Sequence, residues 1–144
     1  MTTRLLRWAP LALTVLLIGG CGDKPPSDGS TIVRIGQVSP LTGPQAHLGR
    51  DNDNGARLAL EEINTQGLTI GGKKITLELK SEDDGADPKT ATTVAQKLVD
   101  EGVVGVIGHL NSGATIPASK IYSDNGIPQI SPSATAVEIG RAHV

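Results

Sequence analysis

Two short segments of the chain combine hydroxyl side chains with small residues, each directly after an apolar run. Residues 111–115 read Asn-Ser-Gly-Ala-Thr, and residues 131–135 read Ser-Pro-Ser-Ala-Thr. In an open sheet of parallel strands, ligands bind beyond the carboxyl ends of the strands. Hydroxyls and free backbone N–H groups there suit a carboxylate, and backbone carbonyls suit an ammonium group. The two segments predict a site for an α-amino acid; the alternative is that their hydroxyls only cap helices.

A serine hydrolase is a second way to use these residues. Ser112 follows a strand and precedes a helix, as a nucleophilic serine does in many hydrolases. However, Leu110 stands where such a turn needs a glycine, and we expect His109, at a strand end, to point away from Ser112. A nucleophilic serine also needs a base that a third group orients. We therefore expect no catalytic residues and keep an exported serine hydrolase as the third functional hypothesis.

Metal, nucleotide and nucleic-acid chemistry are not indicated. The acidic run 51–55 approaches a calcium loop, but its glycine comes one position early, so we interpret it as a polar helix start. The histidines at 47, 109 and 143 lack metal-ligand spacing. A dinucleotide site requires a glycine-rich turn directly after the first strand. The glycines of this chain at 102–108 lie around the third predicted strand instead. The net charge of −2 is spread without a basic stripe. We expect no metal, cofactor or nucleic acid.

Strands and helices alternate along the chain. Apolar patterns predict strands at 31–38, 75–80, 103–107 and 127–130, and helices at 48–66, 88–101 and 112–124. Asp87 is the expected cap of the second helix, and we interpret residues 82–84 as solvated acids that precede it. The core must consist of aliphatic residues, since the chain has no Phe, one Trp and one Tyr. This order predicts the α/β class, a doubly wound parallel sheet with right-handed crossovers.

The amino-terminal residues indicate export. Arg4 and Arg7 precede the apolar stretch 11–18, so we predict a lipoprotein signal peptide at residues 1–20. Cys21 follows Ile-Gly-Gly, a run that resembles the lipobox of bacterial lipoproteins, in which this cysteine is lipidated. The polar residues 21–30 predict a flexible tether. We expect a periplasmic or cell-surface protein that is lipid-anchored to a membrane; the alternative is a plain signal peptide that is cut nearby.

Five motifs occur in an order that resembles one known family. They lie at 36–43, 55–64, 83–88, 106–112 and 130–135. Together they resemble the amino-terminal lobe of the leucine/isoleucine/valine-binding proteins of bacterial ABC importers, which are type I periplasmic binding proteins. The resemblance spans residues 31–138 and implies a Rossmann-like lobe. It also implies a monomer that binds an amino acid, catalyses nothing and delivers its ligand to an ABC permease in the membrane.

The resemblance also assigns roles to individual residues. Ser112 and Thr135 would hold the ligand carboxylate, Ser133 would offer its backbone carbonyl to the ammonium group, and Leu48 would line the pocket. Some members join the loops after the second and third strands by a disulfide. Ala86 and Asn111 stand at those positions here, so that bridge is absent.

The end of the chain departs from the family pattern. Residues 139–144 read Ile-Gly-Arg-Ala-His-Val, which is also the translation of a common sequencing adapter. We expect an artefactual tail, with no role for His143, on a fragment truncated before the second lobe. The leading hypothesis is thus the amino-terminal part of an ABC importer's binding protein for branched-chain or related amino acids or amides. The alternative is a ligand-sensing domain of the same fold that acts in signalling.

Overall fold

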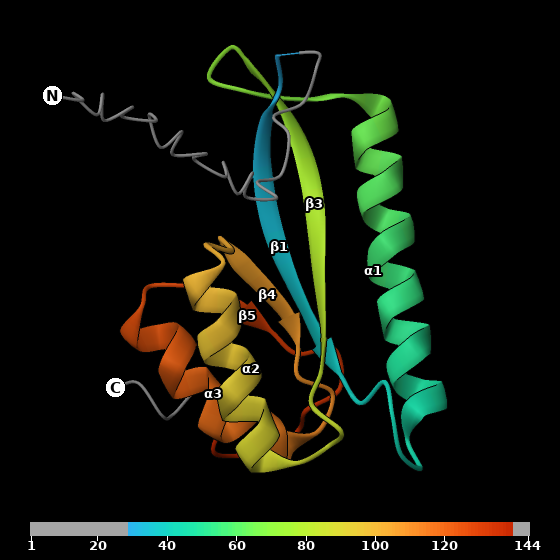
Figure 1. Cartoon of the computed structure of the whole chain (residues 1–144), viewed down its shortest axis with the longest axis vertical. Coiled ribbons are helices and arrows are strands. Elements are labelled where there is room, and N and C mark those ends of the chain that lie inside the picture. Colours follow the sequence, from blue (N-terminus) through green and yellow to red (C-terminus); the bar gives the residue numbers. More distant parts are fainter. Residues whose placement is uncertain (1–28, 140–144) are drawn as a thin grey trace, which may run out of the picture.

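The computed structural model describes residues 29–139. The predicted signal peptide at 1–20, the lipidation site Cys21 and most of the tail at 139–144 lie outside these residues. Eight elements follow one another along the chain (Figure 1): β1 (Thr31–Ser39), α1 (Ala46–Gln66), β2 (Leu68–Ile70), β3 (Lys73–Asp83), α2 (Pro88–Asp100), β4 (Gly105–Gly108), α3 (Ser112–Asp124) and β5 (Gln129–Ile130). The strands form one sheet in the order β2-β3-β1-β4-β5.

The predicted α/β fold with a parallel sheet is confirmed, with one addition at the edge. Strand β1 pairs in parallel with β3 and β4, and β4 pairs in parallel with β5. The addition is β2, which pairs antiparallel with β3. Gly71 and Gly72 make this hairpin turn with φ angles of 56° and 77°, a region that glycine adopts without strain. The sheet is therefore mixed at this edge.

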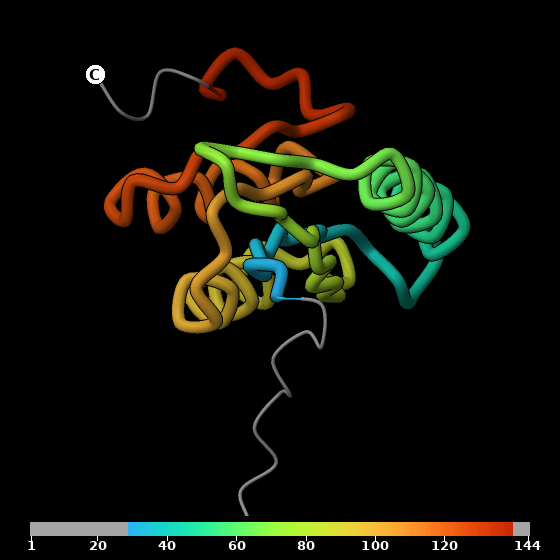
Figure 2. The backbone as a smooth tube through the Cα atoms, turned by 90° about the horizontal axis from the view of Figure 1, so that it is seen from above, coloured from blue at the N-terminus to red at the C-terminus, as the bar shows by residue number. Residues whose placement is uncertain are grey.

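Helices cover both faces of the sheet, as a doubly wound fold requires. Helix α1 lies on one side, and α2 and α3 lie together on the other (Figures 1 and 2). The buried core lies between the sheet and the α2–α3 pair. Alanines at 91, 95, 114 and 118 have no exposed surface and leave room for the helices to approach. Around them pack the larger core side chains, namely Val38, Val94, Leu98, Val103, Val106 and Tyr122.

Local sequence signals define α2 well. The carboxylate of Asp87 accepts a hydrogen bond from the backbone N–H of Thr90 at 2.7 Å, and Pro88 occupies the first helical position. Ala91, Val94, Ala95 and Leu98 then recur at helical spacing, and all four are buried. The predicted cap and the predicted helix are both confirmed.

The start of α1 is fixed against the end of β1. A Cβ atom on Gly49 would collide with the backbone of Pro40, so only glycine permits this approach. The Ser39 hydroxyl donates a hydrogen bond to the Gly49 carbonyl at 3.0 Å. This contact brings the first turn of α1 to the carboxyl end of the sheet, where the predicted site lies.

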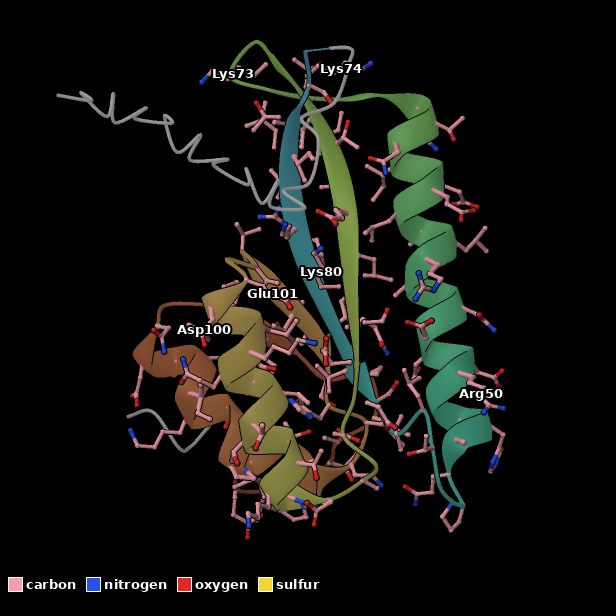
Figure 3. All side chains as sticks on the ribbon, in the orientation of Figure 1. Arg50, Lys73, Lys74, Lys80, Asp100 and Glu101 are labelled. Carbon is pink, nitrogen blue, oxygen red and sulfur yellow. The ribbon has the colours of Figure 1, made fainter. Side chains whose placement is uncertain are left out.

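The outer surface carries charges of both signs. Figure 3 labels Arg50 on α1, Lys73 on β3 and Asp100 on α2, all of which are exposed. Between residues 29 and 139, no helix combines the length and the apolar character that crossing a membrane requires.

Candidate ligand-binding site

The two predicted binding segments meet beyond the carboxyl ends of β4 and β5. Ser112 is the first residue of α3, and its hydroxyl oxygen accepts hydrogen bonds from the backbone N–H groups of Thr135 at 3.2 Å and Ala136 at 3.3 Å. The Ser133 hydroxyl donates a hydrogen bond to the Leu110 carbonyl at 2.7 Å. The segment after β5 is thereby held against the first turn of α3.

A hollow of about 480 Å³ opens at this junction. Such a volume lies within the range of small-molecule sites. Three of the four residues assigned to the ligand, Leu48, Ser112 and Ser133, line it. The fourth, Thr135, reaches the site through its backbone bond to Ser112. The full lining consists of Gln45, Leu48, Asp51, Asn52, Leu110, Asn111, Ser112 and Ser133.

Gln45 and Asn111 form a contact across this hollow that sequence reasoning missed. The Asn111 side-chain amide donates a hydrogen bond to Gln45 Oε1 at 2.8 Å. Both residues stand at helix N-caps, Gln45 for α1 and Asn111 for α3, and neither side chain caps its own helix. The hydrogen bond therefore joins the amino-terminal ends of two helices, where backbone N–H groups favour an anion.

A second hollow of about 340 Å³ lies beside the first and shares Gln45 and Asn111 with it. Ala86 also lines this second hollow. Ala86 and Asn111, the two positions that the family resemblance compares with a disulfide, therefore line one small hollow. In this chain a hydrogen bond to Gln45, rather than a disulfide to residue 86, holds the Asn111 side chain in place.

The interpretation of Asp83 as a solvated acid is wrong. Its carboxylate accepts hydrogen bonds from the Leu41 N–H at 2.8 Å, the Thr42 hydroxyl at 2.6 Å and the Gly85 N–H at 2.8 Å. Burial alone would raise the pKa of Asp83, but the bonds from Thr42, Gly85 and Leu41 together lower it below its ordinary value of 3.8. Asp83 thus fastens the loop after β1 to the end of β3.

The same interpretation is wrong for Asp84, which has no exposed surface. Its Oδ2 atom lies 2.8 Å from His109 Nδ1, and His109 Nε2 lies 3.2 Å from the Tyr122 hydroxyl. His109 and Tyr122 are also fully buried. Burial, with the nearby charges of Asp84 and Glu82, raises the pKa of Tyr122, so its hydroxyl keeps its proton. We call Asp84, His109 and Tyr122 the buried triad.

The buried triad bears on the hydrolase hypothesis. Both ring nitrogens of His109 are engaged, one by Asp84 and the other by Tyr122. Neither nitrogen is free to take a proton from Ser112, whose oxygen instead accepts backbone N–H groups. Among residues 29–139, no cluster of three or more His, Cys, Asp or Glu side chains is placed to hold a metal ion.

The chain folds as an α/β lobe, and its hydroxyl-lined hollow lies beyond the carboxyl ends of its parallel strands. This is the arrangement of lobes that bind ligands. A family model described as a periplasmic binding protein matches residues 32–143, which is most of the chain. The chain therefore belongs to the periplasmic binding protein family, and the family named from the sequence motifs is confirmed.

Comparison with curated relatives shows which members of the family this chain resembles. The chain is similar to Leu/Ile/Val-binding protein homolog 1 of Brucella abortus, with 48% identity over 103 residues, covering 72% of this chain and 27% of that protein. It is 45% identical over 107 residues to the leucine-specific-binding protein of Salmonella typhimurium, covering 74% of this chain and 28% of that protein. The chain thus spans a little over a quarter of the length of these relatives.

A solved structure gives the same assignment. The branched-chain amino acid transporter substrate binding protein LivJ of Streptococcus pneumoniae, in complex with isoleucine, superposes with a TM-score of 0.71 at 33% identity. The match covers 78% of this chain and 32% of that one. A substrate-binding protein of Desulfitobacterium hafniense in complex with Leu matches with a TM-score of 0.61 at 32% identity.

Proposed function

We propose that this chain is part of the substrate-binding component of an ABC importer for branched-chain or related amino acids or amides. The observation that carries the proposal is the position of Ser112, which begins α3, lines the hollow and meets the backbone of Thr135. Relatives with 45–48% identity are named for leucine, isoleucine and valine, and a structural relative holds isoleucine.

The site would bind both charged ends of an amino acid. The Ser112 hydroxyl and the Thr135 hydroxyl, beside the positive end of the α3 dipole, receive the carboxylate. The backbone carbonyl of Ser133 accepts from the ammonium group, and Leu48 packs on the aliphatic part of the ligand. Leu48 is 46% exposed, so it has surface to cover when a ligand arrives.

The same proposal makes the protein a non-enzymatic carrier. With His109 engaged by Asp84 and Tyr122, no histidine contact activates Ser112 in the described residues. Binding needs no cofactor, and the partner that receives the ligand is the importer's permease in the membrane. We propose that the protein acts as a monomer.

Gene neighbours offer a simple check of transport against sensing. Neighbouring permease and ATPase genes favour transport, whereas a kinase or regulator gene favours sensing.

We further propose that the protein is exported and lipid-anchored. Residues 1–20 would be the signal peptide, Cys21 the lipidated residue and 21–30 the tether to a lobe at 31–138. The tether would end at Ser30, which is already attached to the sheet, because its hydroxyl lies 2.7 Å from the hydroxyl of Thr76. Labelling with radioactive palmitate tests the anchor: wild type should incorporate label, and Cys21→Ser should not. A labelled Cys21→Ser protein would contradict the proposal.

We propose that residues 139–144 are an artefactual tail, with no role for His143. Resequencing the locus tests this proposal directly. Genomic DNA that runs continuously through the six codons would contradict it.

Calorimetry of the full-length gene product tests the binding proposal. Leucine, valine, a short amide and urea are titrated separately, and we expect saturable heat with at least one of them. The full-length product is needed because the chain spans only 27–28% of its curated relatives. Absence of binding to all four ligands would overturn the proposal.

A further inference from the structure

The buried triad costs a small domain folding free energy. A carboxylate and two polar rings lie where no water reaches them, since Asp84, His109 and Tyr122 have no exposed surface. Burial of such groups costs free energy that hydrogen bonds only offset, and apolar residues of similar size would often serve stability as well. Stability alone therefore does not account for the buried triad.

Every member of the buried triad has a hydrogen-bonding partner within it. Asp84 Oδ2 lies 2.8 Å from His109 Nδ1, within hydrogen-bond distance. Tyr122 retains its proton because burial raises its pKa. The Tyr122 hydroxyl lies 3.2 Å from His109 Nε2, so each ring nitrogen of His109 has a partner within the buried triad. The groups that face the ring are Asp84 from the loop after β3 and Tyr122 from α3.

The ring of His109 is thus fixed, and so is its backbone. The His109 carbonyl accepts hydrogen bonds from the hydroxyls of Thr115 at 3.0 Å and Ser131 at 2.6 Å. The preceding carbonyl, of Gly108, accepts from the side-chain amide of Gln129 at 2.8 Å. Side chains from α3, from β5 and from the segment after β5 therefore bind two adjacent peptide units, Gly108–His109 and His109–Leu110.

These two peptide units directly precede residues that line the candidate site. Ser112 follows His109 by three residues, and the intervening Leu110 and Asn111 line the hollow. On the opposite side, the hydroxyl of Ser131 also accepts from the Ala134 N–H at 3.0 Å, directly before Thr135. His109 therefore sets the distance between the segment that carries Ser112 and the segment that carries Thr135.

We propose that His109, held by Asp84 and Tyr122, is a positioning residue that keeps Ser112 and Thr135 at the spacing that a ligand carboxylate requires. The effect that we expect on ligand binding rests on the proposed function. The structural consequence, an ordered segment from Leu110 to Thr115, can be measured without any ligand.

The test compares Tyr122→Phe with Val94→Ala. Tyr122→Phe keeps the aromatic ring in the core but removes the hydroxyl that lies 3.2 Å from His109 Nε2. Val94 packs in the same core from α2 and is 8% exposed, so Val94→Ala lowers stability without removing a polar contact. Thermal unfolding first establishes how far each variant is destabilised.

Two measurements then follow on the full-length gene product. Hydrogen exchange, read at the amides of residues 110–115, should be about tenfold faster in Tyr122→Phe than in Val94→Ala under conditions of equal global stability. Calorimetry with leucine should show a Kd about tenfold higher for Tyr122→Phe, and a Kd within about twofold of wild type for Val94→Ala.

Equal exchange in the two variants at residues 110–115 would overturn the inference whatever the ligand is. Faster exchange with an unchanged Kd for leucine would also overturn it, because the ordering would then not serve binding. If wild type binds none of the four ligands named above, the proposed function fails, and the exchange comparison still decides whether His109 orders the segment.

Discussion

The hydroxyl oxygen of Ser112 lies 3.2 Å from the backbone nitrogen of Thr135, a residue 23 positions further along the chain. This contact joins the helix after one strand to the segment after the next strand. It leaves the Ser112 O–H hydrogen free to donate to a carboxylate.

Replacement of Ser112 by alanine should weaken amino-acid binding. A hydrogen bond to a charged group is worth about 1.5–3 kcal/mol, so the Kd for leucine should rise about ten- to a hundredfold. Ser119→Ala on the same helix is the control, since that hydroxyl only donates to the Ile116 carbonyl. Calorimetry on both variants of the full-length product makes the comparison, and equal Kd values would exclude Ser112 from the carboxylate site.

Removal of the side chain of Leu98 should destabilise the lobe strongly. Leu98 is a residue of α2 with no exposed surface, so Leu98→Ala leaves a cavity in the core and should cost about 2–5 kcal/mol of unfolding free energy. Leu58 on α1 is 57% exposed, and Leu58→Ala should cost no more than about 0.5 kcal/mol. Urea unfolding measures both, and similar losses would contradict the placement of the core.

Two glycines of the same helix should respond to alanine in opposite directions. Gly55→Ala adds a methyl group into open space within α1, so it should stabilise by about 1 kcal/mol through helix propensity. Gly49→Ala places a Cβ against the Pro40 backbone, so it should destabilise by about 2 kcal/mol or more. Thermal unfolding distinguishes them, and a stabilising Gly49→Ala would disprove the close approach of α1 to β1.

The contribution of Asp83 should depend on pH. Its folded pKa lies below the ordinary value of 3.8, so the folded state favours the carboxylate. Asp83 therefore stabilises the fold fully at pH values well above 3.8, and that stabilisation is lost as the pH falls through the lowered folded pKa. Asp83→Asn should be less stable than wild type at pH 7, and the difference should shrink below pH 3.8.

Urea unfolding of wild type and Asp83→Asn across this range makes the measurement. Asp51→Asn is the control, because Asp51 is exposed on α1. A gap between wild type and Asp83→Asn that is the same at acidic and neutral pH would show that the carboxylate charge of Asp83 plays no part.

Elements encoded by local patterns could be predicted from the sequence. Asp87, Pro88 and the apolar spacing up to Leu98 specify α2 within a dozen residues, and the structure confirms it. Strand β2 could not be predicted, because it is three residues long and exists only through its pairing with β3. An alternating pattern needs more positions than that to be distinguished from a loop.

Hydrogen bonds between side chains far apart in the sequence could not be predicted either. Asp84 and His109 are 25 positions apart, and Gln45 and Asn111 are 66 apart. Nothing in the neighbouring residues distinguishes the buried Asp84 from an exposed acid at a strand end. The histidine at the end of an otherwise apolar strand was the available signal, since a buried imidazole requires partners. Ser112 and Ser133, in contrast, come a few residues after β4 and β5, which are neighbouring strands of the sheet. The order of the strands was therefore enough to predict that these two serines lie close together.

Tyr122 is the only tyrosine of the sequence, which has no phenylalanine and whose single tryptophan is Trp8. Near-ultraviolet absorption and emission from residues 29–139 therefore originate in one phenol ring. The hydroxyl of that ring lies 3.2 Å from His109 Nε2, so its spectrum should change when the hydroxyl loses this hydrogen-bonding partner. For a protein limited to residues 29–139, second-derivative absorbance of the tyrosine band thus gives a single-residue optical readout of the structure next to the candidate site, without any introduced label.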